Sequence, residues 1–246
     1  MCNSESGAGA SRRRFLGLAA GLAAISTGGG ALAAPRHKVL IVGDSMIATA
    51  FGEYLQSGLE TRHSYPVRRR GKSSSGLARP DFFDWMSEAQ RLEGAYTPGA
   101  VVVMMGGNDA QGLYLGPRRW EMWGTRTWRK LYAERVRQFA DLLTERERPL
   151  FWIGLPTVRS SQYRRKIALI NEIIRDEMTS RPHGNFVSTW HTLAAPDGRY
   201  TDRIALGRKL VKVRDSDGVH LTIAGAHVLE NYVRPIIHGK LSDTYS

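Results

Sequence analysis

The stretch KVLIVGDSMIATA, from Lys38 to Ala50, decides the fold of this chain. Val39 to Gly43 form a short apolar run, which is typical of a strand that is buried on both faces. The chain turns at Gly43, and Asp44 and Ser45 precede an apolar helical pattern from about Met46 to Leu59. A serine at this first strand-to-helix turn either caps the helix or is a nucleophile that the rest of the chain activates.

Strand-like and helix-like patterns alternate through the rest of the chain. We expect further strands at 65–70, 99–106, 149–156 and 185–190, and helices at 81–94, 126–147, 163–178 and 222–237. We assign neither a strand nor a helix to the stretch 196–217, which is rich in glycine and charged residues. The polar strand at 65–70 is expected near a sheet edge. This alternation predicts an α/β three-layer sandwich, with a central, mostly parallel sheet of about five strands and helices on both faces.

The first 33 residues have the pattern of an export signal. Arg12 to Arg14 precede an apolar run from Phe15 to Ile25, and Ala31-Leu32-Ala33 fits a cleavage site. Ser11 to Leu16 also fits the twin-arginine type; an ordinary secretory signal and an uncleaved anchor are the alternatives. We therefore expect residues 1–33 to be a twin-arginine signal peptide and 34–246 to be one periplasmic or secreted domain.

Cysteine usage and charge narrow the chemistry of that domain. Cys2, the only cysteine, lies in the signal, which excludes disulfides, a cysteine nucleophile and thiolate metal sites after it. Neither His183 nor His191 has a metal-type partner at close spacing, so we expect no metal and no other cofactor. The formal net charge is +12, of which +2 belongs to residues 1–33. In an exported protein the remaining charge suits phospholipid headgroups or anionic glycans, not nucleic acid, although each basic cluster alone is equally compatible with a charged, soluble surface.

Three polar motifs lie near the ends of predicted strands, where ligands bind in sheets of this kind. GDS follows the first strand, GGND spans 106–109, and DSDGVH spans 215–220. Each motif alone has an ordinary interpretation as capping or turn residues. Together they suit nucleophilic catalysis, because a serine needs an adjacent base. His220 is the candidate base, and Asp217, three residues earlier, can hold its other ring nitrogen.

The segments GDSM, SSSGLARPDFFDW, GGNDAQ, GLPTVR and DGVHLTIAGAH together resemble the SGNH (GDSL-type) hydrolase superfamily. Within it they resemble a bacterial branch described as a domain of unknown function. The resemblance runs from about Val39 to the C-terminus, and Met46 replaces the leucine of the name motif. It implies a flavodoxin-like SGNH hydrolase fold.

The resemblance also implies roles for individual residues. Ser45 would be the nucleophile of a triad with His220 and Asp217. The oxyanion hole would consist of the Ser45 N–H, the Gly76 N–H and the Asn108 side-chain amide.

Several further residues are candidates for other roles. His227 is a rival base, but its place within the last predicted helix favours a packing or surface role. Asp44 is interpreted as structural. The aromatic segment 113–128 is either a lid or substrate wall, or an insertion that packs on itself. Tentative substrate contacts are Arg79, Asp109, Trp120 and Trp123; Asp109 is also expected to orient the loop around Asn108.

The sequence thus predicts an exported serine esterase that hydrolyses O-acyl esters, of the O-acetyl type, on a cell-envelope glycan. Three alternatives remain open: an O-acetyltransferase that works beside a membrane acyl-transfer partner, a lipase or lysophospholipase, and a non-catalytic glycan-binding module. The intact set of five motif residues argues against the last. The predicted ligand is an acylated glycan or a small ester, and the oligomeric state is not predicted.

Overall fold

The computed structural model describes residues 37–145 and 147–244, so the predicted signal at 1–33 lies outside the described residues. Five strands form one sheet in the order β2-β1-β3-β6-β7, and all neighbours are parallel. They are β1 (Val39–Gly43), β2 (Val67–Gly71), β3 (Ala100–Met104), β6 (Leu150–Ile153) and β7 (Gly184–Val187). This order is that of the flavodoxin-like folds and confirms the predicted fold class.

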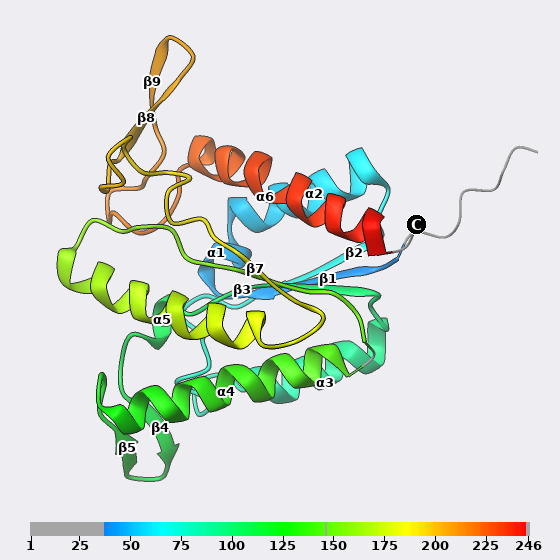
Figure 1. The fold of residues 1–246 in the computed structure, drawn as a ribbon, viewed down its shortest axis with the longest axis vertical. Coiled ribbons are helices and arrows are strands. Elements are labelled where there is room, and N and C mark those ends of the chain that lie inside the picture. The colour runs from blue at the N-terminus through cyan, green and yellow to red at the C-terminus, as the bar shows by residue number, and fades with distance from the viewer. Residues whose placement is uncertain (1–36, 146, 245–246) are drawn as a thin grey trace, which may run out of the picture. The chain divides into compact units, whose positions relative to one another are not determined.

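Helices cover both faces of the sheet (Figure 1). One face carries α2 (Ala50–His63) and α6 (Ile223–Thr244), and the other carries α3 (Trp85–Tyr96), α4 (Arg126–Thr144) and α5 (Ser161–Thr179). Every residue of β1 and β3 is buried, which explains their unbroken apolar sequences. The polar β2 lies at the predicted edge. Among the described residues, no helix has the length and apolar composition needed to cross a membrane.

Two predicted helices begin or run differently in the structure. The helix expected from Met46 is two helices, α1 (Ser45–Ala48) and α2, because Thr49 between them is extended, with φ −112° and ψ −167°. The helix expected from Asp81 begins at Trp85. Asp84 sets that start, because its side chain accepts hydrogen bonds from the backbone N–H groups of the second and third helical residues, at 3.0 and 3.2 Å.

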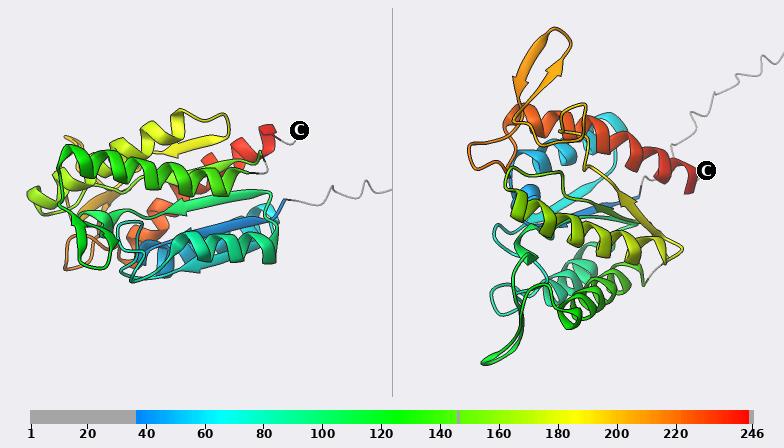
Figure 2. Two further views of the ribbon diagram at one scale, coloured as in Figure 1. Left: turned by 90° about the horizontal axis from the view of Figure 1, so that it is seen from below. Right: turned by 60° about the vertical axis from the view of Figure 1, so that its left-hand side comes forward.

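The structure also contains two hairpins that the sequence patterns did not predict. One pairs β4 (Leu113–Gly116) with β5 (Arg119–Glu121), and the other pairs β8 (Arg203–Leu206) with β9 (Lys209–Lys212). Both extend beyond the three layers (Figure 2). Their strands are only three or four residues long, and β5, β8 and β9 are largely exposed, so they lack the sustained apolar periodicity that marks a buried strand.

The helix α6 is packed directly against the chain that leads into the DSDGVH motif. A Cβ atom on Gly225, in the first turn of α6, would lie 2.0 Å from the backbone oxygen of Val213. A Cβ atom on Gly239, near the other end of the same helix, would meet nothing within 4 Å. One substitution is therefore expected to have opposite effects at the two ends of this helix.

We predict that Gly225→Ala lowers the free energy of unfolding by about 1–3 kcal/mol, because the helix must move away from Val213. Gly239→Ala should raise it by about 0.5–1 kcal/mol, because alanine favours the helix over glycine. Urea denaturation of the two variants and the wild type measures both changes. Equal shifts in the two variants would contradict the close packing at Gly225.

Candidate active site

Ser45 is presented at the point of the sheet where the strand order reverses, between β1 and β3. Asp44 caps the short helix α1 by accepting the Met46 N–H at 3.0 Å, and Ser45 is half-buried. The turn requires glycine at position 43, because a Cβ atom there would lie 2.1 Å from the backbone oxygen of Met104. The close packing of β1 on β3 therefore sets the position of the serine.

The structure brings Ser45, His220 and Asp217 into one chain of hydrogen bonds. Ser45 Oγ lies 2.8 Å from His220 Nε2, and His220 Nδ1 lies 2.5 Å from Asp217 Oδ2. Since Nδ1 donates to the carboxylate, Nε2 is left to accept the serine proton. The other carboxylate oxygen accepts the N–H groups of Val219 and His220, at 2.8 and 2.9 Å.

Asp217 remains ionised over a wide pH range. Partial burial alone would raise its pKa, but the hydrogen bonds from the His220 ring and from two backbone N–H groups outweigh it. Together they lower the pKa of Asp217 to about 2. The carboxylate is therefore available to hold the imidazole at any pH near neutrality.

The loop that carries Asp217 and His220 is held by a buried arginine that the sequence analysis did not single out. The guanidinium of Arg214 donates to the backbone oxygens of Val219, at 3.0 Å, and Thr157, at 2.7 Å. Burial lowers the pKa of Arg214 to about 10, so it remains a cation at neutral pH. This side chain ties the loop to the segment that follows β6.

Two of the three predicted oxyanion donors, Gly76 and Asn108, lie on neighbouring loops. Asn108 follows β3 in the 3-10 turn η1 (Gly107–Asp109), and its amide nitrogen donates to the backbone oxygen of Ser75 at 3.0 Å. Among the described residues, its second amide hydrogen and the N–H of Gly76 have no acceptor. The N–H of Ser45 has none either. Ser45 and Asn108 line one shallow hollow with His220.

Asp109 does not fit the tentative role of a substrate contact. It is only 1% exposed, and its two carboxylate oxygens accept the Ala78 N–H at 2.7 Å and the Tyr132 hydroxyl at 2.9 Å. A Cβ atom on Gly76 would lie 2.1 Å from Asp109 Oδ1. Asp109 instead holds the Gly76 loop beside Asn108, as the orienting role predicted.

Asp44 is a second buried carboxyl, 2% exposed, directly before the serine. Burial, and to a smaller degree the charge of Asp109, raise the pKa of Asp44 to about 7, although the hydrogen bond from the Met46 N–H opposes this. A substantial fraction of the Asp44 carboxyl is therefore neutral near pH 7, which limits the negative charge next to Ser45.

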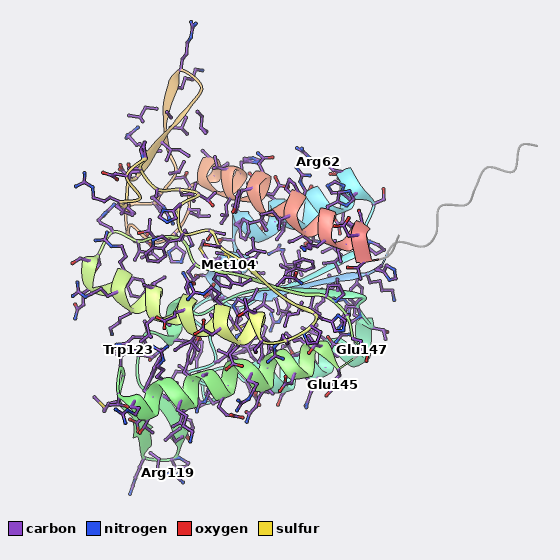
Figure 3. All side chains as sticks on the ribbon, viewed as in Figure 1. Arg62, Met104, Arg119, Trp123, Glu145 and Glu147 are labelled. Atoms are coloured by element: carbon purple, nitrogen blue, oxygen red, sulfur yellow. The ribbon has the colours of Figure 1, made fainter. Side chains whose placement is uncertain are left out.

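The other tentative substrate contacts do not line the pocket at Ser45. Arg79 pairs with Asp81 at 2.8 Å and its guanidinium lies over the Trp120 ring, 4.9 Å from the centroid. Trp123 packs on Trp128, which is itself fully buried at the start of α4. The aromatic segment forms a hairpin and the first turn of α4, not a wall of this pocket. Figure 3 shows Arg119 at the end of that hairpin, pointing away from the sheet.

The rival base is placed elsewhere. The exposed His227 ring stacks on the ring of Tyr54, with centroids 3.7 Å apart, which agrees with the predicted packing or surface role.

A small pocket of about 230 Å³ opens beside Ser45 and His220. Its walls are mainly apolar and come from the segment after β6, from α5 and from the loop before α6; they include Leu155, Val158, Ile167 and Val219. Tyr163, which sequence reasoning missed, also lines it and donates from its hydroxyl to the Gly107 oxygen at 2.8 Å. The pocket offers a short apolar group a place next to the serine hydroxyl.

Similar folds occur among solved structures. A GDSL-like lipase from Bacteroides thetaiotaomicron is 16% identical with a TM-score of 0.55, covering 83% of this chain and 89% of that chain. A catalytic mutant of an acetylxylan esterase from Geobacillus stearothermophilus is 16% identical with a TM-score of 0.52, covering 80% and 92%. An alpha/beta hydrolase enzyme from the metagenome of Lake Arreo, Spain, is 16% identical with a TM-score of 0.53, covering 80% and 93%. At this identity the likeness shows a shared fold.

Comparison of the sequence with known proteins and families identifies the family. No curated protein sequence matches the chain. The resemblance to a branch of unknown function is confirmed, because the family described as "Protein of unknown function (DUF459)" matches residues 38–235. Since that match covers most of the chain, this protein belongs to the DUF459 family.

Proposed function

We propose that this protein is a serine hydrolase of carboxylic esters. The observation that carries the proposal is the hydrogen-bonded chain from Ser45 through His220 to Asp217, at 2.8 and 2.5 Å. A serine hydroxyl becomes nucleophilic when a neighbouring imidazole takes its proton, and a carboxylate that holds the imidazole stabilises the charge that results. All three groups meet at the mouth of a pocket.

The reaction follows from this geometry. His220 Nε2 accepts the hydroxyl proton while Ser45 Oγ attacks the ester carbonyl carbon. The carbonyl oxygen becomes an oxyanion that the Ser45 N–H, the Gly76 N–H and the Asn108 amide stabilise. The imidazolium returns the proton to the leaving alcohol, and an acyl-serine remains. Water then attacks the acyl-serine with His220 as the base, and the acid leaves.

Solved structures of similar fold support these assignments. Three of them are structures of catalytic mutants of the acetylxylan esterase in which a serine, an aspartate or a histidine is replaced by alanine. That aspartate and histidine are three positions apart, as Asp217 and His220 are. The same spacing lets one loop supply both groups in this chain.

We further propose that the substrate carries a short acyl group, of the acetyl type, on a cell-envelope glycan. The pocket of about 230 Å³ is smaller than the roughly 300–1,000 Å³ of typical drug-sized ligand sites, which favours a short acyl group over a lipid chain. The export pattern at residues 1–33 and the basic composition favour an envelope substrate. No observation favours the acyltransferase over the hydrolase.

The first test removes the reacting groups one at a time. Ser45→Ala and His220→Ala should each abolish turnover, and the double variant should be barely worse, because triad members act as a unit. Asp217→Ala should retain more activity. Asn108→Ala should lower kcat by roughly 10²–10³ with little change in KM, because an oxyanion donor acts in the transition state. Steady-state kinetics on a small acetyl ester measures these values, and His227→Ala is the matched control. Loss of turnover in His227→Ala but not in His220→Ala would contradict the assignment.

A second test concerns the acyl group and the acceptor. In a series of esters from acetyl to long acyl, kcat/KM should fall once the chain outgrows the pocket. Ile167→Ala should extend the tolerated length, because the pocket gains space where the side chain stood. Mass spectrometry of the products, with and without a glycan acceptor, separates hydrolysis from transfer. Preferential formation of an acylated glycan would favour the O-acetyltransferase.

Export is proposed on the sequence pattern alone. Arg12→Lys together with Arg13→Lys should block export through the twin-arginine route while it leaves the charge unchanged. Cell fractionation measures the outcome. Unchanged export of this variant would remove the twin-arginine assignment and leave the proposed hydrolase untouched.

A further inference from the structure

The hairpin of β8 and β9 is basic and carries exposed apolar side chains. Residues 203–212 read RIALGRKLVK, with four basic residues and no acidic residue. The four basic side chains, Arg203, Arg208, Lys209 and Lys212, are exposed. Within 37–145 and 147–244, none of the four lies within ion-pair distance of a carboxylate. The hairpin is therefore a positive arm whose four cations form no ion pair with the described residues.

Two leucines of this hairpin are exposed beside those charges. Leu206 is 42% exposed and Leu210 is 65% exposed. Leu206 pairs with Lys209 and Leu210 pairs with Ala205 across the strands, so the leucines lie on opposite faces. Exposed lysines on an edge strand protect it from aggregation, but exposed leucines work against that protection. An apolar tip among cations needs a partner that is both anionic and apolar.

The outer part of the hairpin stands away from the body of the fold, whereas Ile204, Ala205 and Leu210 line an open hollow with the segment 191–198. In Figures 1 and 2 it extends past the helices, on the side of the molecule where β1 ends. Only Ile204 and Val211 are partly buried at its base, where the Val213 N–H bonds to the Asp202 oxygen at 2.8 Å. From β9 the chain runs directly into the loop that carries Asp217 and His220. A surface that held this tip would lie near the candidate active site.

We propose that the β8–β9 hairpin docks on the surface of an anionic lipid bilayer. Arg208 and Lys209 contact the headgroups, and Leu206 and Leu210 enter the boundary between headgroups and acyl chains. Binding at such an interface combines electrostatic attraction to anionic lipid with burial of apolar side chains. A soluble anionic glycan would pair with the cations but would leave both leucines in water. A bilayer accounts for both the exposed cations and the exposed leucines of the hairpin.

A local probe tests the proposal directly. In the full chain, Cys2→Ser with Leu210→Cys allows a polarity-sensitive fluorophore to be attached at the tip. Cys2→Ser with Arg62→Cys provides the matched control, because Arg62 is exposed in the last turn of α2, away from the hairpin (Figure 3). Vesicles with about one-third phosphatidylglycerol should make the tip probe brighter and shift its emission to shorter wavelength. The control probe should not change with these vesicles, and neither probe should change with vesicles of phosphatidylcholine alone. A tip probe that stays in water when the chain sediments with vesicles would overturn the proposal.

Variants of the hairpin separate the electrostatic contribution to vesicle binding from the apolar contribution. Arg208→Gln with Lys209→Gln should weaken partitioning onto anionic vesicles roughly thirtyfold, and Leu206→Ser with Leu210→Ser roughly tenfold. Leu210→Trp should preserve binding. Arg62→Gln with Lys240→Gln makes the same change in charge at exposed positions on α2 and α6 and should have little effect. Residues 1–36 are the same in all these variants. Differences in vesicle binding between the variants therefore measure the contribution of the hairpin.

Two outcomes would overturn the lipid assignment. Equal loss in both charge variants would show that net charge alone drives binding. Binding to a soluble polyanion such as dextran sulfate that needs Arg208 and Lys209 but not the leucines, with no vesicle binding, would assign the arm to a glycan. The Ser45→Ala variant should bind vesicles as the wild type does. The lipid contact of the hairpin and the proposed hydrolase activity are therefore tested independently of each other.

Discussion

The candidate site depends on one buried carboxylate. Asp109 accepts the Ala78 N–H and the Tyr132 hydroxyl, and so joins three elements: the loop after β2, the turn after β3 and the helix α4. Its position leaves no room for a side chain at Gly76. A buried donor that loses its acceptor costs about 1–3 kcal/mol, so these contacts hold the two loops together strongly. The Gly76 N–H and the Asn108 amide keep their relative positions because of this residue.

The opposite wall of the site depends on a buried cation. Arg214 crosses from the DSDGVH loop to the segment after β6, and backbone oxygens accept its hydrogen bonds. Its Nε and the Thr157 hydroxyl have no partner among the described residues, which costs stability. The cation nevertheless fixes the loop from which His220 reaches Ser45. Asp109 and Arg214 thus hold the two sides of the site from within the core, without lining the pocket at Ser45.

The proposed reaction and the proposed lipid contact use different parts of the molecule. The site is built from strand ends that the sheet packs rigidly, whereas the β8–β9 hairpin is an exposed arm with a small buried base. The two are linked only by the short run from β9 to Asp217. An envelope ester would suit both, because the arm would hold the protein at the surface where such substrates lie.

The sequence by itself determined the buried strands, the glycine turn before Ser45 and the pairing of Asp217 with His220. These features are local: a fully covered strand needs an unbroken apolar run, and a spacing of three residues within one turn brings the carboxylate to the ring. The superfamily resemblance added the proposed roles of Gly76 and Asn108, whose geometry residue spacing alone does not specify.

Only the tertiary structure decided the rest. The contact of Ser45 with His220 joins residues 175 positions apart, and it forms because parallel strands bring their ends to one edge of the sheet. Asp109 and Arg214 belong to residue types that are usually exposed, and their burial follows from the elements that pack around them. The two hairpins were missed because their strands are short and three of the four are largely exposed, so that they need no apolar period. The pocket beside Ser45 exists only where the segment after β6, α5 and the loop before α6 meet, which no local pattern in the chain encodes.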